Sequence, residues 1–274
     1  SAVKIGPLPV VVTSRRFIEA AKLDDLVDAI KETERSPGRR VRMLYLEDVR
    51  KEIGFLEKAI GFATSLAPSL ATAILFTSGT EGLPKGVALT NANLVANARQ
   101  IFTHAAGFLS AQDTAMNPLP MFHSFGLTAG TLMPLLSGMK SVLYPSPLHY
   151  KQIPKLIKET KATLLFSTDT FLQGYARAAD EGDTDSLRYV VAGAERVKEA
   201  TREMWSRSGT EILEGYGATE CSPVISCNLP DQKQHGSVGR LLPGIETRLL
   251  PVEGIAEGGR LQVRGPNVMA GYIL

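Results

Sequence analysis

Cysteine, histidine and tryptophan are scarce in this chain: its 274 residues include 2 cysteines, 4 histidines and 1 tryptophan. Two cysteines, Cys221 and Cys227, are too few to form the disulfide framework of a small secreted scaffold. The histidines and cysteines also lack the paired spacing of zinc ligands. Disulfide scaffolds and zinc proteins are therefore disfavoured, and we expect reduced thiols in a cytosolic setting.

An excess of charge is also missing, because 30 basic residues nearly balance 28 acidic ones for a net charge of +2. No basic block is interleaved with aromatic residues, so we expect no nucleic-acid partner.

A long uninterrupted hydrophobic run is missing too. The most apolar segment, residues 125–143, is broken by polar residues and Pro134, which favours a buried helix followed by a strand over a membrane span.

Short apolar runs alternate with segments of helical spacing along most of the chain. One helical segment covers residues 14–30 and starts at a serine suited to capping, and another covers residues 53–60. Thr90 and Ser124 can cap the helices that follow them, and Gly138 can end the second of these. The runs that predict strands are residues 10–13, 41–46, 71–76, 115–120, 141–144, 162–166, 187–191 and 211–213.

Strands that are joined by helices usually pair in parallel. We therefore predict the α/β class, with mostly parallel sheets flanked by helices in a layered large domain. The pattern changes near Gly236, after which the strand-like runs at residues 246–250 and 260–264 are separated by glycine turns without a helix. This predicts an α/β core over residues 1–235 and the beginning of a small β subdomain over residues 236–274.

A loop rich in hydroxyls and glycines follows the predicted strand at residues 71–76. Glycines let the backbone turn its N–H groups inward, hydroxyls add donors and a lysine adds positive charge, so such a loop is suited to a polyphosphate. It is not a Walker A loop, because Pro84 precedes Lys85 and Gly86 follows it. A plain polar connection is the alternative. The candidate phosphate ligands are Thr77, Ser78, Gly79, Thr80, Glu81, Gly82 and Lys85.

Two further loops lie where α/β sheets bind ligands, beyond the carboxyl ends of strands. One carries His123 directly after Phe122, and a histidine beside aromatic residues is more often packed in a core than catalytic. The other reads Gly193, Ala194, Glu195, and its two small residues allow a flat ring to approach the backbone.

A fourth loop follows the strand predicted at residues 211–213. Tyr216 offers a stacking face, Thr219 a hydroxyl, and Glu220 a carboxylate of the kind that Mg²⁺ prefers. The alternative is a strand–turn–helix junction capped by Thr219 and Glu220. Together the four loops contain the parts needed to hold a nucleoside triphosphate with its magnesium ion.

The loops, in this order and spacing, resemble the adenylate-forming superfamily of acyl-CoA synthetases, firefly luciferases and peptide adenylation domains. Residues 77–86 look like its phosphate loop, residues 216–220 like its Tyr-Gly-x-Thr-Glu motif, and residues 259–272 like a motif near the end of its large domain. One branch is more similar still, the synthetase half of the bacterial bifunctional acyl-[acyl-carrier-protein] synthetase/2-acylglycerophosphoethanolamine acyltransferase. That likeness lies in residues 45–48, 118–127, 144–150 and 212–217.

The resemblance implies a two-step reaction. A fatty-acid carboxylate attacks the α-phosphate of ATP, giving acyl-AMP and pyrophosphate, and a phosphopantetheine thiol then attacks the acyl carbonyl. In the bifunctional branch the thiol belongs to acyl carrier protein and the product supports lysophospholipid reacylation. A fatty acid–CoA ligase, a non-catalytic adenylate- or acyl-binding module and a luciferase-like oxygenase are the alternatives.

Residue roles follow from the same resemblance. Ser78, Thr80 and Lys85 would hold the β- and γ-phosphates, Glu220 would bind Mg²⁺, and Thr219 would contact the α-phosphate. The candidate catalytic residues are His123, Thr219 and Glu220. The residues expected around adenine are Tyr216, Gly217, Gly193, Ala194 and Glu195, and those expected around the acyl chain are His123, Phe122, Gly126 and Ala129.

The position of His123 also bears on the substrate class. Peptide-forming members of the family carry an aspartate after the phenylalanine, which pairs with the amino group of their substrate. A histidine in its place leaves an ammonium group without its partner in a desolvated pocket, at a cost of several kcal/mol. A fatty or aryl acid is therefore expected rather than an amino acid.

Neither end of the chain looks natural, since it starts at Ser1 without methionine or a signal peptide and stops at Leu274. We expect an excised piece. Family members continue with a ribose-binding aspartate, a hinge and a small domain that carries a catalytic lysine, so we expect this piece to turn over inefficiently. The resemblance further implies a cytoplasmic domain without a membrane span, in a parent protein at the bacterial inner membrane.

Overall fold

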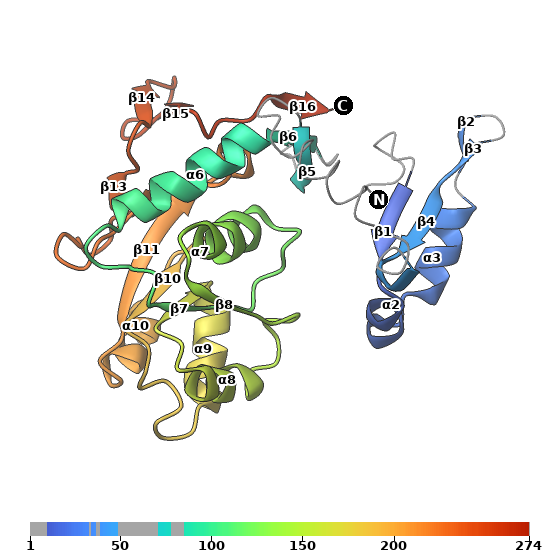
Figure 1. Ribbon diagram of the computed structural model, residues 1–274. Helices are drawn as coiled ribbons and strands as arrows, with labels where there is room; N and C mark the ends of the chain where they lie inside the picture. Colours follow the sequence, from blue (N-terminus) through green and yellow to red (C-terminus); the bar gives the residue numbers. More distant parts are fainter. Residues whose placement is uncertain (1–9, 33, 37–38, 49–70, 78–84, 274) are drawn as a thin grey trace. The chain divides into compact units, whose positions relative to one another are not determined.

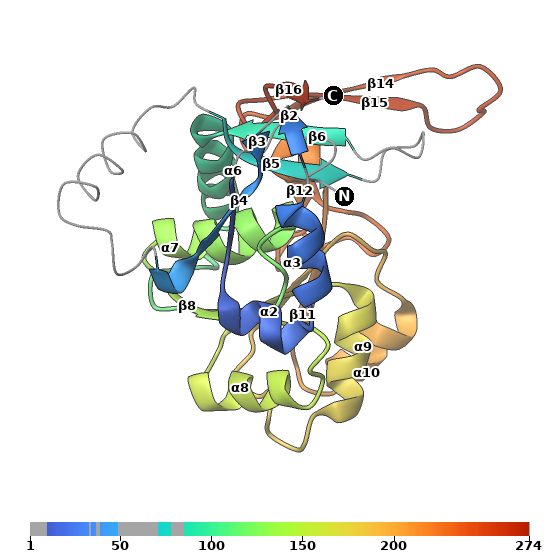
Figure 2. The same ribbon diagram turned by 90° about the vertical axis from the view of Figure 1, so that its right-hand side faces the viewer.

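A computed structural model describes residues 10–32, 34–36, 39–48, 71–77 and 85–273 (Figure 1, Figure 2). The helix expected over residues 53–60 lies outside these ranges. The chain divides into two compact units: residues 1–70, 76–86 and 272–274 form one, and residues 71–75 and 87–271 form the other.

In the first unit, β1 (Val10–Thr13) pairs in parallel with β4 (Arg42–Tyr45), close to the predicted strands. The single helix expected over residues 14–30 is wrong. Lys22 adopts a left-handed conformation with φ 52°, which ends α2 (Arg15–Ala21) before α3 (Asp24–Lys31) begins. Ser14 precedes α2, but its hydroxyl donates to Glu47 Oε1 at 2.7 Å instead of capping the helix. β2 (Glu34–Ser36) and β3 (Arg39–Arg40) form a short antiparallel pair.

A seven-stranded sheet forms the centre of the second unit, in the order β13-β12-β11-β10-β9-β7-β8. Its five parallel strands are β7 (Thr114–Asn117), β8 (Lys140–Leu143), β9 (Leu164–Ser167), β10 (Tyr189–Ala192) and β11 (Glu211–Gly217). β12 (Val224–Cys227) and β13 (Arg240–Leu241) extend it in the antiparallel sense.

Side chains that alternate along the strands pack into two hydrophobic cores, one on each face of this sheet. In β9, Leu165 packs into the first core, and Leu164 and Phe166 pack into the second. Helices α8 (Gln152–Thr160), α9 (Asp169–Ala178) and α10 (Glu199–Ser206) cover the first face. Helices α6 (Asn91–His104), η1 (Phe125–Leu132, a π-helix) and α7 (Met133–Leu136) cover the second (Figure 1). The predicted α/β class is confirmed.

Local predictions around this sheet have mixed outcomes. Thr90 caps α6 as expected, because its Oγ1 accepts the Asn93 N–H at 3.1 Å and Asn93 Oδ1 accepts the Thr90 N–H at 3.0 Å. The Ser124 cap is wrong, since Ser124 has helical dihedral angles and makes no side-chain cap hydrogen bond. The strand expected at residues 71–76 is β5 (Ala71–Thr77), and it is not buried throughout: Ile74 is 39% exposed and Leu75 9%.

β5, β6 (Lys85–Thr90) and β16 (Gly271–Ile273) form a three-stranded sheet with β6 in the middle. β14 (Glu246–Leu250) and β15 (Arg260–Arg264) pair in the antiparallel sense without a helix between them, as predicted. The domain boundary near residue 236 stays a prediction. In the part of the chain that the structure describes, no helix combines the length and apolar character that crossing a bilayer requires.

Candidate functional site

A cavity of about 260 Å³ lies where β10 and β11 end at the carboxyl edge of the sheet. Three of the four loops predicted to carry chemistry border it: residues 123–125, residues 193–194 and residues 215–219. The turn and strand that follow add Pro223, Val224 and Cys227. The structure therefore brings together segments that are far apart in the sequence, at the edge where α/β sheets bind ligands.

Gly193 and Ala194 form the wall next to β10. A Cβ on Gly193 would lie 3.3 Å from Cε1 of Phe125, and the Gly193 N–H donates to the Ser167 carbonyl at 3.2 Å. Ala194 adopts a left-handed conformation with φ 66°. Small residues at this point do let a flat ring approach the backbone, and one ring that does so belongs to the protein itself, on Phe125.

Three carboxylates hold the segment that follows Gly193. Glu195 Oε2 accepts the Thr170 N–H at 3.1 Å and its hydroxyl at 2.8 Å, so this side chain is directed at the start of α9. Glu214 Oε1 accepts the Val197 N–H at 2.9 Å, and Asp169 Oδ1 accepts the Lys198 N–H at 3.0 Å. Glu195 does not line this cavity, but it lines a neighbouring pocket together with Ala194, Tyr216 and Gly217, and its expected role beside adenine stays a prediction.

The sequence did not single out Asp169 or Glu214, which are 1% and 8% exposed. Burial alone would raise the pKa of Asp169, but hydrogen bonds from the Thr201 hydroxyl, the Lys198 N–H and the Gln173 amide lower it overall. Glu214 also forms an ion pair with Arg202. The position of Asp169 in the sequence could have identified it, because it opens the helix that directly follows β9.

Tyr216 and Gly217 belong to a strand rather than to a loop. β11 runs to Gly217, beyond the predicted end at residue 213, because its last residues pair with β12 through a register shift at Tyr216/Gly217. Tyr216 lines the cavity and is 44% exposed. A Cβ on Gly217 would lie 2.2 Å from the Pro223 carbonyl oxygen, so this crossing requires glycine.

Thr219 and Glu220 lie on η2 (Thr219–Cys221), a single 3₁₀ turn. The Thr219 hydroxyl borders the cavity and lies 3.5 Å from the Ser124 hydroxyl, which links the second and fourth loops. Glu220 is half-buried beside the cavity, and its carbonyl accepts the Met269 N–H at 2.8 Å. Among the described residues, no three His, Cys, Asp or Glu side chains gather as a metal site. A single carboxylate still suits Mg²⁺, which often takes its other ligands from substrate phosphates and water.

His123 lines the cavity beside Ser124. Its Nδ1 accepts the Phe125 N–H at 3.2 Å, so the neutral ring carries its proton on Nε2. Partial burial lowers the pKa of His123 and favours this neutral form.

Of the residues expected around the acyl chain, His123 lines this cavity, whereas Phe122, Gly126 and Ala129 do not. Phe122 is 80% exposed. Ala129 is 1% exposed within the core cluster that includes Phe166. A Cβ on Gly126 would lie 2.4 Å from the Pro120 carbonyl oxygen, so its missing side chain accommodates the protein's own backbone. The acyl-pocket role of these residues stays a prediction.

The phosphate loop lies mostly outside the described residues, among them Ser78, Gly79, Thr80, Glu81 and Gly82. Its ends are described: Thr77 closes β5 and Lys85 opens β6. The Lys85 ammonium group lies 5.5 Å from the centre of the Tyr272 ring, in a cation–π arrangement. The phosphate-binding role stays a prediction.

Cys227 also lines the cavity, although the sequence offered no reason to expect it there and the number of cysteines served only to disfavour a disulfide scaffold. Its Sγ lies 3.5 Å from the Cβ position of Gly215, on the neighbouring strand. Burial raises the pKa of this thiol to about 12.

The chain is similar to known proteins in both its sequence and its fold. The chain matches the AMP-binding enzyme family over residues 9–273. It is 34% identical over 209 residues to a long-chain-fatty-acid–CoA ligase of Yersinia pestis, covering 72% of this chain and 37% of that ligase. A long-chain-fatty-acid–CoA ligase of Escherichia coli O157:H7 is 32% identical over 219 residues, covering 76% and 38%. The fold resembles that of the anthranilate CoA ligase AuaEII in complex with anthranoyl-AMP, with a TM-score of 0.76 and 22% identity over 97% of this chain and 52% of that one. The chain thus spans less than two fifths of either long-chain ligase.

Proposed function

The chain belongs to the AMP-binding enzyme family, and from that membership we propose that it is the nucleotide-binding part of an acid–thiol ligase. In the first step a fatty-acid carboxylate oxygen attacks the α-phosphorus of ATP, the bond to the bridging oxygen of the β-phosphate breaks, and pyrophosphate leaves. In the second, a phosphopantetheine sulfur attacks the acyl carbonyl of the acyl-adenylate, its proton passes to solvent, a thioester forms and AMP departs.

The cavity at the ends of β10 and β11 is the observation that carries the proposal. It offers a tyrosine face at Tyr216, small residues at Gly193 and Ala194, and a hydroxyl at Thr219. In our proposal adenine stacks on Tyr216 and Thr219 donates to the α-phosphate, where negative charge develops during attack.

The magnesium ion is assigned to Glu220, with Lys85 and the loop before it on the terminal phosphates. When bound, the ion would neutralise charge on the phosphate oxygens. The half-buried Glu220, which directly follows Thr219 on the same 3₁₀ turn, supports this assignment. Lys85 would act as a point charge from the start of β6.

An acid without an amino group is the proposed substrate. The lowered pKa of His123 favours the neutral ring, and a histidine has no negative charge that could pair with an ammonium group. The long-chain ligases among the relatives support a fatty acid in particular.

Two acceptors remain as candidates. Acyl carrier protein, with lysophospholipid reacylation at the bacterial inner membrane, rests on the likeness of residues 118–127 and 144–150 to the bifunctional branch. Coenzyme A is supported by the names of the relatives, which are CoA ligases. Supplying the natural full-length protein with ATP, Mg²⁺, a fatty-acid series and both acceptors side by side would show which thioester forms.

Binding by this chain tests the proposal directly. We expect a fatty-acyl sulfamoyl adenosine, a non-hydrolysable acyl-adenylate mimic, to bind in a calorimetric titration, and its aminoacyl counterpart to bind at least about tenfold more weakly. His123→Asp supplies a carboxylate that can pair with the ammonium group, and it should reduce the difference in affinity between the fatty-acyl and aminoacyl mimics. Absence of binding by the fatty-acyl mimic would refute the proposal, whereas binding without ligase activity of the full-length protein would indicate a non-catalytic module.

A further inference from the structure

A second and larger pocket, of about 1040 Å³, lies on the same unit and shares no lining residue with the cavity described above. It is formed by the connection between β8 and α8, by helix α9, and by Lys198 before α10. Nothing in the proposed ligase chemistry uses it.

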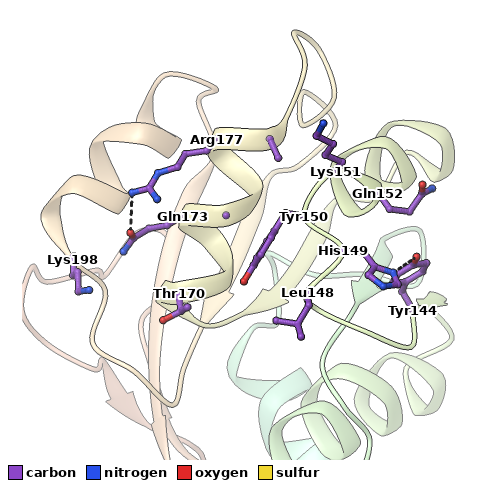
Figure 3. A pocket seen from close by; sticks show the side chains of 12 residues that line it. Tyr144, Leu148, His149, Tyr150, Lys151, Gln152, Thr170, Gln173, Arg177 and Lys198 are labelled. Atoms are coloured by element: carbon purple, nitrogen blue, oxygen red, sulfur yellow. Dashed lines mark hydrogen bonds between the residues drawn. The ribbon is translucent and has the colours of Figure 1, made fainter. Parts of the chain in front are cut away.

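The charge of this pocket is of one sign. Its lining includes Lys151, Arg177 and Lys198 and contains no aspartate or glutamate. Figure 3 shows Arg177 and Lys198 on one side of Tyr150 and Lys151 on the other. The chain as a whole carries a net charge of only +2, so three cations around one pocket are a local concentration.

These cations have few partners of their own. Arg177 donates to the uncharged Gln173 at 3.4 Å, and the 70%-exposed Lys198 ammonium lies 3.8 Å from the buried carboxylate of Asp169. For Lys151 there is no ion pair among the described residues. Lys198 is thus paired with Asp169, whereas Arg177 and Lys151 form no ion pair among the described residues.

An aromatic wall faces the cations. Tyr150 lies flat against α9, where a Cβ on Gly174 would come within 2.2 Å of its ring, so the glycine makes room for the tyrosine. The Tyr150 and Tyr175 ring centres are 5.9 Å apart. Beside them, the Tyr144 hydroxyl and His149 Nδ1 form a 2.8 Å hydrogen bond that fixes both rings (Figure 3).

We propose that this pocket binds a phosphomonoester whose phosphate is attached to an aromatic or apolar group. A phosphate dianion satisfies more of the three cations than a single carboxylate, and the planar guanidinium of Arg177 can hold two of its oxygens. The attached group packs against Tyr150. The phosphate can come from a soluble metabolite or from a lipid headgroup, since both present the same chemistry.

Titration with phenyl phosphate, without ATP or fatty acid, tests this proposal independently of the ligase function. We expect one-to-one binding that weakens as salt is raised. The double variant Lys151→Gln/Arg177→Gln should lose about tenfold or more in affinity. The matched control Lys140→Gln/Lys155→Gln removes two exposed cations that do not line the pocket, and should bind like the wild type.

Two further probes sharpen the outcome. Benzoate, with one carboxylate, should bind more weakly than phenyl phosphate, and inorganic phosphate should too because it lacks the ring. Phosphatidylcholine vesicles with and without phosphatidic acid separate a lipid source from a soluble one. Equal binding by the double variant and the wild type, an equal loss in the control, or benzoate binding as tight as that of phenyl phosphate would overturn the proposal.

Discussion

The hydroxyl of Ser124 lies 3.5 Å from the hydroxyl of Thr219, although 95 residues separate them in the chain. Ser124 is buried at the start of η1, and Thr219 begins the 3₁₀ turn after β11. The pair joins two loops at the edge of the cavity. The polar side of the cavity is thus assembled from two segments that lie far apart in the second unit's sequence.

Thr219→Val removes the hydroxyl and keeps the shape of the side chain. Under the proposed role we expect affinity for the fatty-acyl sulfamoyl adenosine to fall about tenfold, because one hydrogen bond to a charged group is lost. Thr247→Val, on the exposed strand β14, is the control and should leave affinity unchanged. Equal affinity of Thr219→Val and wild type in the calorimeter would contradict the role.

Substitution of Gly193 should narrow the cavity in steps. A Cβ there meets the Phe125 ring at 3.3 Å, so alanine requires a small shift of the ring and valine a larger one. We expect affinity for the acyl-adenylate mimic to decrease from glycine to alanine to valine. Thermal unfolding of each variant provides the control, and a loss of affinity that only tracks a loss of folded protein would count against a steric cause.

Asp169→Asn should destabilise the protein in a pH-dependent manner. The folded-state pKa of Asp169 is lowered, so its stabilising contribution is present above the unfolded pKa of about 4 and is lost as the pH falls through the folded value. Urea unfolding should show a deficit of roughly 1–3 kcal/mol for the variant at neutral pH, shrinking in acid. The exposed Asp180→Asn is the control, with an expected change within about 0.5 kcal/mol. A deficit that grows in acid would contradict this account.

The two cysteines should resist alkylation in the folded protein. Burial raises the pKa of Cys227 to about 12 and that of Cys221 to about 11, so the reactive thiolate is rare near neutral pH. Mass spectrometry after iodoacetamide treatment should find both unmodified in the native protein and both modified in urea. Rapid modification of native Cys227 would contradict the expected low reactivity of this thiol.

The repeated strand–helix pattern predicted most of the second unit, because apolar runs such as residues 162–166 had to be buried on both faces of a sheet. Errors arose where a partner far along the chain decides local structure. Tyr216 and Gly217 resemble a loop in sequence, but β12 supplies a neighbour that extends the strand. The orientation of the Glu195 carboxylate depends in the same way on Thr170, which offers it two donors, and its role beside adenine stays a prediction. Cys227 could not be assigned to the site from sequence because only the return of β12 brings it there.

Residues 193–198 take their shape from contacts at Thr170, Glu214 and Asp169 rather than from within the segment. This part of the cavity wall therefore depends on residues outside the segment for its conformation. Chimeras that exchange this segment alone between members of the family would carry the cavity residues without the anchors that orient them. An exchange that keeps these contacts has to include the beginning of α9, with Asp169 and Thr170, and the middle of β11, with Glu214.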